Sequence, residues 1–281
     1  LKFSTTRTSE KLVFERIGSE ATPFAFNNDI TGLNIIELSG ANTHVTMGSD
    51  NGYDLVDGQI NLLGPTTVLN VTGNITGTGG LTKTGDGTLR LSGTNNYAGD
   101  TRVDQGFLEV KVGGSIGSGK LVLSGVEESL EVGAGLEGGI TLGNEIQIGS
   151  VVNNEVRSLL YSIHGGSSST ETNRLTNIIT LYENLDVASG AQTELILSGP
   201  IDATSGGGQG LSLFGFGGNV VFSGGIGQTE ALGSVLFGVD GLTFGVSELA
   251  SDVTTTGSQS YRVAVTLGSD VTLEGEGISA T

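Results

Sequence analysis

The chain has 281 residues, 49 of them glycine, and a formal net charge of −18 at pH 7. That charge makes nucleic acid and anionic membrane surfaces unfavourable partners, because both repel an acidic protein. Glycine at well over twice its usual share of about 7%, with no period of three, indicates a turn-rich β protein and excludes a collagen.

The sequence contains no cysteine, so stability has to come from burial and strand stacking instead of disulfides. No apolar run is long enough for a membrane-spanning helix, so we expect no membrane insertion. No signal peptide precedes Leu1, and the first residue is not Met. We therefore expect a processed or excised piece of a longer protein.

Residues 1–26 differ in composition from the rest of the chain. They hold four of the twelve cations and carry a small positive net charge, which leaves the remainder strongly acidic. Leu12, Phe14 and Arg16 alternate with other residues and predict a strand over 11–17. We expect residues 1–26 to be an N-terminal cap; the alternative is a segment that donates a strand to another molecule.

From residue 27 onward, short two-period segments alternate with runs of Gly, Asn and Asp, which tolerate the backbone of tight turns. Tetrapeptides that end in Leu-Ser-Gly, or in Phe-Ser-Gly in the last case, recur at 37–40, 90–93, 122–125, 196–199 and 221–224. Their unequal spacing favours an irregular β-helix over a propeller with equal blades. With coils of roughly 20 residues, about 13 coils would stack. Further strands are predicted at His44–Met47, Gln59–Leu62, Val68–Val71, Lys120–Leu123, Ile140–Leu142, Glu145–Ile148, Glu194–Leu197, Gly210–Leu213, Val263–Leu267 and Val271–Leu273.

The stretch 77–112 shows the two-period pattern most clearly, so it predicts which side chains face the core. Leu89, Leu91, Leu108 and Val110 are expected to point inward, and Arg90, Glu109 and Lys111 outward.

The same stretch, GTGGLTKTGDGTLRLSGTNNYAGDTRVDQGFLEVKV, resembles the passenger-associated transport repeat of bacterial autotransporter passengers. Asp100 and Arg102 stand where Gly and Thr are commoner. The positions that follow the pattern are Gly80, Leu81, Lys83, Gly85, Gly87, Leu89, Leu91, Ser92, Gly93, Asn95, Tyr97, Gly99, Thr101, Val103, Gly106, Leu108 and Val110.

A second stretch, 219–277, resembles repeats of giant filamentous-haemagglutinin-like exoproteins. The resemblances cover 77–124 and 219–277 and imply a right-handed parallel β-helix (a solenoid) over residues 27–281. They also imply secretion to the outside of a bacterium or display on its surface, and no catalytic residues.

Residues 151–188 interrupt the glycine-rich pattern and contain a polar run at 167–173. They predict a strand, a loop excursion around 164–175 and another strand. We expect a solvated hairpin; the alternative is a binding loop, because long loops on rigid scaffolds often carry function.

No catalytic constellation is evident. A glycosidase needs two carboxylates about 5–10 Å apart, and the densest acidic group is Asp50, Asp54 and Asp57. Their oxygens suit calcium, but the spacing is not that of an EF-hand loop, so we expect a solvated acidic turn and leave metal binding there open. His44 and His164 each lack a second ligand nearby and are expected to be ordinary residues.

Lys83 belongs to the repeat pattern and is expected on the outer face, where it would make a surface contact. We expect no enzyme, no metal site and no cofactor.

The sequence thus predicts a non-enzymatic structural or adhesive β-helix segment of a bacterial surface or exported protein. Its expected partners are host or surface glycans or proteins, or a second copy bound head to tail through residues 1–26 and the C-terminal coil. Two alternatives stay open: a self-assembling subunit of an extracellular filament or surface layer, and a tailspike-like carbohydrate-active enzyme.

Overall fold

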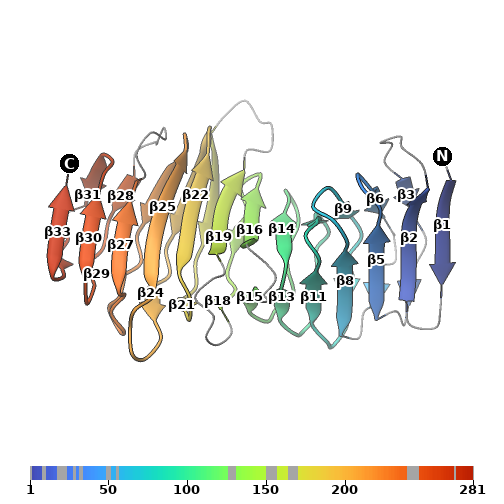
Figure 1. Ribbon diagram of the computed structural model, residues 1–281, viewed down its shortest axis with the longest axis horizontal. Coiled ribbons are helices and arrows are strands. Elements are labelled where there is room, and N and C mark those ends of the chain that lie inside the picture. Colours follow the sequence, from blue (N-terminus) through green and yellow to red (C-terminus); the bar gives the residue numbers. More distant parts are fainter. Residues whose placement is uncertain are drawn as a thin grey trace. The chain divides into compact units, whose positions relative to one another are not determined.

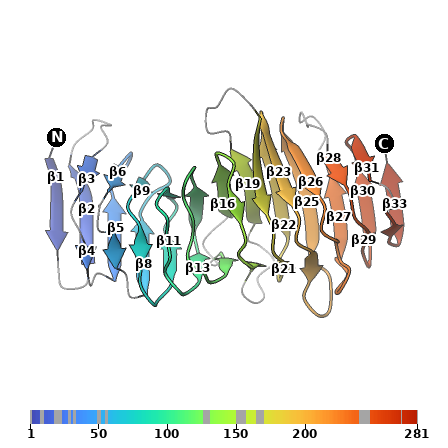
Figure 2. The same ribbon diagram turned by 180° about the vertical axis from the view of Figure 1, so that it is seen from behind.

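The computed structural model describes residues 2–7, 11–17, 24–27, 30–31, 34–48, 52–54, 57–125, 131–149, 157–163, 170–238, 247–268 and 270–280. Within these ranges the secondary structure is β-strand and turn, with no helix (Figures 1 and 2). The chain divides into two compact units, Leu1–Ala134 and Gly135–Thr281, and the boundary falls within strand β16 (Glu131–Glu137).

Unit 1 is built from parallel strands that stack coil upon coil. One sheet has the order β1-β2-β5-β8-β11-β13-β15, a second has β3-β6-β9-β12-β14, and a short third has β4-β7-β10. Each pairing is parallel except that of β1 with β2, which is antiparallel. The strands are β1 (Lys2–Arg7), β2 (Lys11–Ile17), β3 (Phe24–Phe26), β4 (Ile30–Thr31), β5 (Ile35–Ser39), β6 (His44–Met47), β7 (Tyr53–Asp54), β8 (Gly58–Leu62), β9 (Val68–Val71), β10 (Ile75–Thr76), β11 (Leu81–Thr84), β12 (Thr88–Leu91), β13 (Thr101–Val103), β14 (Gly106–Val110) and β15 (Leu121–Leu123).

Unit 2 repeats this arrangement with parallel sheets in the orders β18-β21-β24, β19-β22-β25-β27-β30-β33, β17-β20-β23-β26-β28-β31 and β29-β32. The strands are β17 (Thr141–Leu142), β18 (Ile146–Ile148), β19 (Arg157–Ile163), β20 (Glu171–Leu175), β21 (Ile179–Leu181), β22 (Leu185–Gly190), β23 (Thr193–Leu197), β24 (Ile201–Ala203), β25 (Gly210–Phe216), β26 (Asn219–Phe222), β27 (Ser234–Phe237), β28 (Ser247–Leu249), β29 (Val253–Thr254), β30 (Ser258–Tyr261), β31 (Val265–Leu267), β32 (Leu273–Glu274) and β33 (Gly277–Ala280).

Both units are therefore parallel β-helices with irregular coils, as the sequence predicted. The coil length varies, because register partners lie 24 residues apart at Lys11 and Ile35, 20 apart at Leu81 and Thr101, and 33 apart at Ile146 and Ile179. Most coils are longer than the roughly 20 residues assumed from the shorter repeat families. The expectation of about 13 coils is accordingly too high.

The core lies inside each coil and is mostly aliphatic. Leu89, Leu91 and Leu108 are fully buried and Val110 is 1% exposed, which confirms the predicted inward register. In hydrogen-bonded register, Leu91 pairs with Val71 on one side and Val110 on the other. Similar side chains of successive coils therefore line up in continuous columns. The loss of conformational entropy on ordering each strand is offset by the apolar surface that it buries on both sides.

The predicted N-terminal strand is β2, and the structure shows which side chains it buries and which strands it pairs with. Leu12 and Phe14 are buried as expected, and the Phe14 ring packs against those of Phe24 and Phe26 at centroid distances of 6.1 and 5.5 Å. Along its edges β2 pairs with β1 on one side and β5 on the other. Both edges of the segment KLVFERI are thus already hydrogen-bonded within the chain.

Most predicted strands are present, and His44–Met47 and Val68–Val71 match their bounds. The weakest match is Val271–Leu273, because β32 begins at Leu273. The Thr272 amide donates to Asp252 Oδ1 at 2.7 Å, so the backbone before Leu273 belongs to a turn. Of the predicted loop excursion at 164–175, residues 164–169 lie outside the described ranges. Residues 171–175 form strand β20, paired with β23.

Candidate functional site

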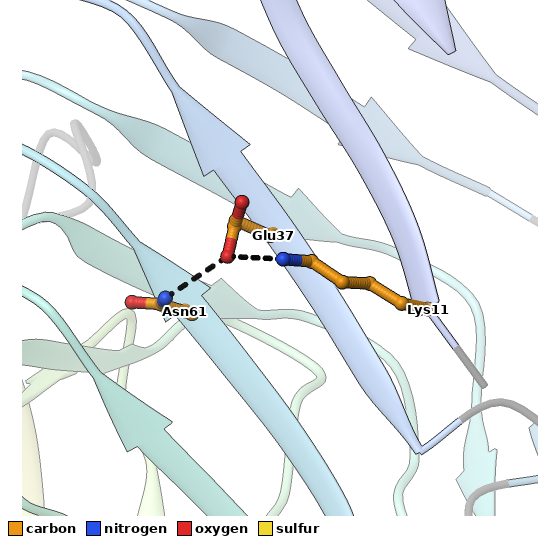
Figure 3. Close-up of polar contacts among 3 residues, drawn as sticks. All are labelled: Lys11, Glu37 and Asn61. Atoms are coloured by element: carbon orange, nitrogen blue, oxygen red, sulfur yellow. Dashed lines mark hydrogen bonds and ion pairs between the residues drawn. The ribbon is translucent and has the colours of Figure 1, made fainter. Parts of the chain in front are cut away.

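The outer face of the first sheet carries a polar ladder across three coils (Figure 3). Lys11 Nζ lies 2.7 Å from Glu37 Oε2, and Asn61 Nδ2 donates to the same oxygen at 3.2 Å. The three side chains come from β2, β5 and β8, which adjoin one another in the sheet. Because these groups are partly exposed, the ion pair contributes little to stability, in the range of about 0–1 kcal/mol.

Two other outward cations of unit 1 are matched by carboxylates in the same way. Arg90 Nε lies 2.7 Å from Glu109 Oε2, and Arg102 Nε lies 2.5 Å from Asp104 Oδ1. Unit 2 has a different balance, because residues 135–281 contain three arginines, no lysine and fifteen Asp and Glu residues. Unit 2 therefore carries the larger share of the chain's negative charge.

Side chains of Asp and Asn tie the turns of successive coils together. In these inter-coil clasps, a side-chain Oδ1 accepts a hydrogen bond from a backbone amide 20 to 27 residues away. Each clasp satisfies an amide that a tight turn would otherwise leave without a partner. The acceptors and donors are Asp57 and Gly80, Asn74 and Thr94, Asp100 and Lys120, Asn184 and Gly210, Asp202 and Thr229, and Asp252 and Thr272.

Of the candidate acidic group Asp50, Asp54 and Asp57, the structure describes two residues. Asp50 lies outside the described residues, whereas Asp54 and Asp57 are exposed and Asp57 takes part in a clasp. In the part of the chain that is described, no three His, Cys, Asp or Glu side chains group closely enough to hold a metal ion. His44 lies in β6 opposite Val68, and His164 lies outside the described ranges.

Lys83 is not on the outer face, and this corrects the sequence-based expectation. Its side chain is fully buried in the inward register of β11, next to Leu81 and between Ile60 and Val103 of the adjacent coils. The ammonium donates to the backbone carbonyls of Thr84 (3.1 Å), Gln105 (2.9 Å) and Gly85. A lysine is almost never fully buried unless its charge is satisfied, and these three carbonyls provide the acceptors.

Buried polar side chains of unit 2 were likewise not anticipated from the sequence. Asn173 accepts from the Ile140 amide at 2.7 Å and donates to the Leu136 carbonyl and to Ser162 Oγ. Asn173 alternates with the buried Leu175, so the two-period pattern predicts an inward position. Its polar amide predicts an outward one. Two of its bonds reach the Leu136 carbonyl and the Ile140 amide, so Asn173 ties β20 to the end of β16 and the segment before β17 in the adjacent coil.

Comparison with known proteins gives two matches. The family model described as the passenger-associated-transport-repeat matches residues 81–110. The chain is also 26% identical to the adhesin BmaC autotransporter of Brucella suis biovar 1 (strain 1330), over 84% of this chain and 8% of that protein. The chain thus spans less than a tenth of the length of this relative.

No solved structure matches the chain. Among the residues that the structure describes, no helix is long and apolar enough to cross a membrane.

Proposed function

Because residues 81–110 are a passenger-associated transport repeat, we propose that this chain is an adhesive β-helix segment in the passenger of a bacterial autotransporter. An extracellular or bacterial cell-surface location follows from the same relationship. The observation that carries the proposal is the repeat on a parallel β-helix, together with similarity to a protein named as an adhesin.

We propose a non-enzymatic role, with surface glycans or proteins as partners. The inter-coil clasps support this role, because they commit turn carboxylates to backbone amides. The excess of negative charge on unit 2 further favours partners without strong acidity.

Adhesion can be tested with beads that carry the folded chain, offered to immobilised neutral glycans, acidic glycans and extracellular proteins. Binding well above that of beads coated with the heat-unfolded chain is expected for at least one neutral or basic surface. Equal binding of folded and unfolded chains to every surface would contradict an adhesive role for this segment.

Head-to-tail assembly is the second candidate, and strand edges favour it. Among the described strands, β1 is paired with β2 alone and β33 with β30 alone, and such edges are templates for strand addition. Since both edges of β2 are occupied, a donated or accepted strand would have to use β1. The exposed Asp270, Glu274 and Glu276 near β33 complement the positive balance of residues 1–26.

Deleting residues 1–20 tests this assembly, because the deletion removes both β1 and β2. Light scattering at increasing concentration should show filaments of the intact chain, and electron microscopy should show none for the truncated chain. A monomeric intact chain, or filaments of a folded truncated chain, would rule out this route.

A further inference from the structure

The residue that departs most from sequence expectation is Lys83, whose contacts join two coils of unit 1. Two of its three acceptors are Thr84 O, at the end of β11, and Gly85 O, in the turn between β11 and β12. The third, Gln105 O, belongs to the turn between β13 and β14. The Gln105 side chain closes the arrangement, because its Oε1 accepts from the Gly85 amide at 3.2 Å.

Glycine makes this arrangement possible at both turns. Gly85 and Gly106 have φ values of 72° and 65°, in the left-handed region that side chains disfavour. A Cβ on Gly85 would lie 2.3 Å from the Leu62 carbonyl oxygen. The backbone can therefore fold tightly enough to aim its carbonyls at one ammonium.

In the described strands around the site, no carboxylate forms an ion pair with Lys83. β8 contains no titratable side chain, the Arg102 and Asp104 side chains of the β13 region pair with each other, and the Glu109 of β14 pairs with Arg90. Asp86, which is exposed in the adjoining turn, is the charged group that acts on Lys83. The ammonium is thus held by dipoles, without a full compensating charge.

We propose that Lys83 is a pH-sensitive fastener between the 84–87 turn and the 104–106 turn of unit 1. In the ammonium form its three protons match three carbonyl acceptors. In the neutral form two protons remain and a lone pair faces the third carbonyl, so one tie between the turns is released. This inference is independent of the proposed adhesive role.

The protonation change falls in a physiologically relevant range. Desolvation lowers the pKa of Lys83 from 10.5 to about 7, and Asp86 raises it in part. The unfolded chain therefore binds a proton that the folded chain lacks between these two values. Burying the ammonium therefore costs more than its third hydrogen bond returns, and the folded chain gains stability as the pH rises from about 7 to 10.5, although one tie between the turns is released. Each pH unit in that window changes the folded-to-unfolded ratio by up to about tenfold.

NMR titration of the lysine side-chain signals, with Lys83 assigned by its loss in Lys83→Met, measures the fastener directly. We expect a midpoint near pH 7, and the backbone amide signals of 84–87 and 104–106 should shift with the same midpoint. A Lys83 midpoint near 10.5, or turn signals that do not follow Lys83, would overturn the proposal. Both midpoints are measured on the unmodified chain. If Lys83→Met does not fold, the Lys83 signal can be assigned by another method and the test is unchanged.

Urea unfolding between pH 6 and 9 supplies a second readout. The unmodified chain and Lys120→Met, which changes an exposed lysine of the same unit, should both become more stable as the pH rises. Lys83→Met should lack this gain, because it keeps a long apolar stem but cannot titrate. The same pH dependence in all three proteins would mean that Lys83 has no such role.

Discussion

Leu91→Asp is expected to destabilise unit 1 by more than about 3 kcal/mol, because it buries an unpaired carboxylate. Leu91 is fully buried, and its register partners Val71 and Val110 are 2% and 1% exposed. Neither adjacent coil offers a hydrogen-bond donor from these side chains. The aspartate must therefore take up a proton or open the column of aliphatic side chains.

Leu63→Asp is the matched control, since it makes the same substitution at a side chain that is 44% exposed. Its expected effect is within about 0.5 kcal/mol. Arg90 would be a poorer control, because Arg90→Asp would set two carboxylates side by side at Glu109. Urea unfolding followed by circular dichroism measures both variants, and equal midpoints for Leu91→Asp and Leu63→Asp would mean that the inward register is wrong.

Gly224→Ala is expected to destabilise unit 2 by roughly 1–3 kcal/mol, the usual cost of inserting a methyl group into a closely packed site. A Cβ at this position would lie 2.0 Å from the Gly199 carbonyl oxygen and 2.3 Å from its carbon. Gly199 is equally close to the coil before it, because a Cβ at Gly199 would lie 1.9 Å from the Asn177 carbonyl oxygen. The glycines that end the 196–199 and 221–224 tetrapeptides thus mark direct backbone contact between coils.

Gly143→Ala provides the comparison, because the nearest atom to its Cβ would be Thr176 Oγ1 at 3.7 Å and its backbone is not left-handed. Little change or a small gain in thermal midpoint is expected there. If Gly224→Ala were as stable as Gly143→Ala in thermal unfolding, close coil contact at the tetrapeptides would not constrain the fold.

Some features follow from local sequence because they depend on neighbouring residues alone. The two-period alternation placed Leu89, Leu91, Leu108 and Val110 inward, and each is buried. Runs of Gly, Asn and Asp located the turns, because these residues adopt tight backbone conformations whatever lies around them. Unequal spacing of the tetrapeptides likewise indicated irregular coils. The local pattern therefore favoured an irregular β-helix, and its right-handed parallel form was implied by the resemblance to the passenger-associated transport repeat.

Other features were decided by contacts between coils, which local patterns do not encode. The inter-coil clasps join residues 20 or more positions apart. The interruption at 151–188 marked a departure from the pattern, but the 33-residue step itself is set by the pairing of Ile146 with Ile179. Lys83 shows the physical reason most clearly. Alternation with Leu81 pointed it inward and its charge pointed it outward. The conflict is resolved by Gln105, whose carbonyl reaches Lys83 only because the next coil stacks directly on β11.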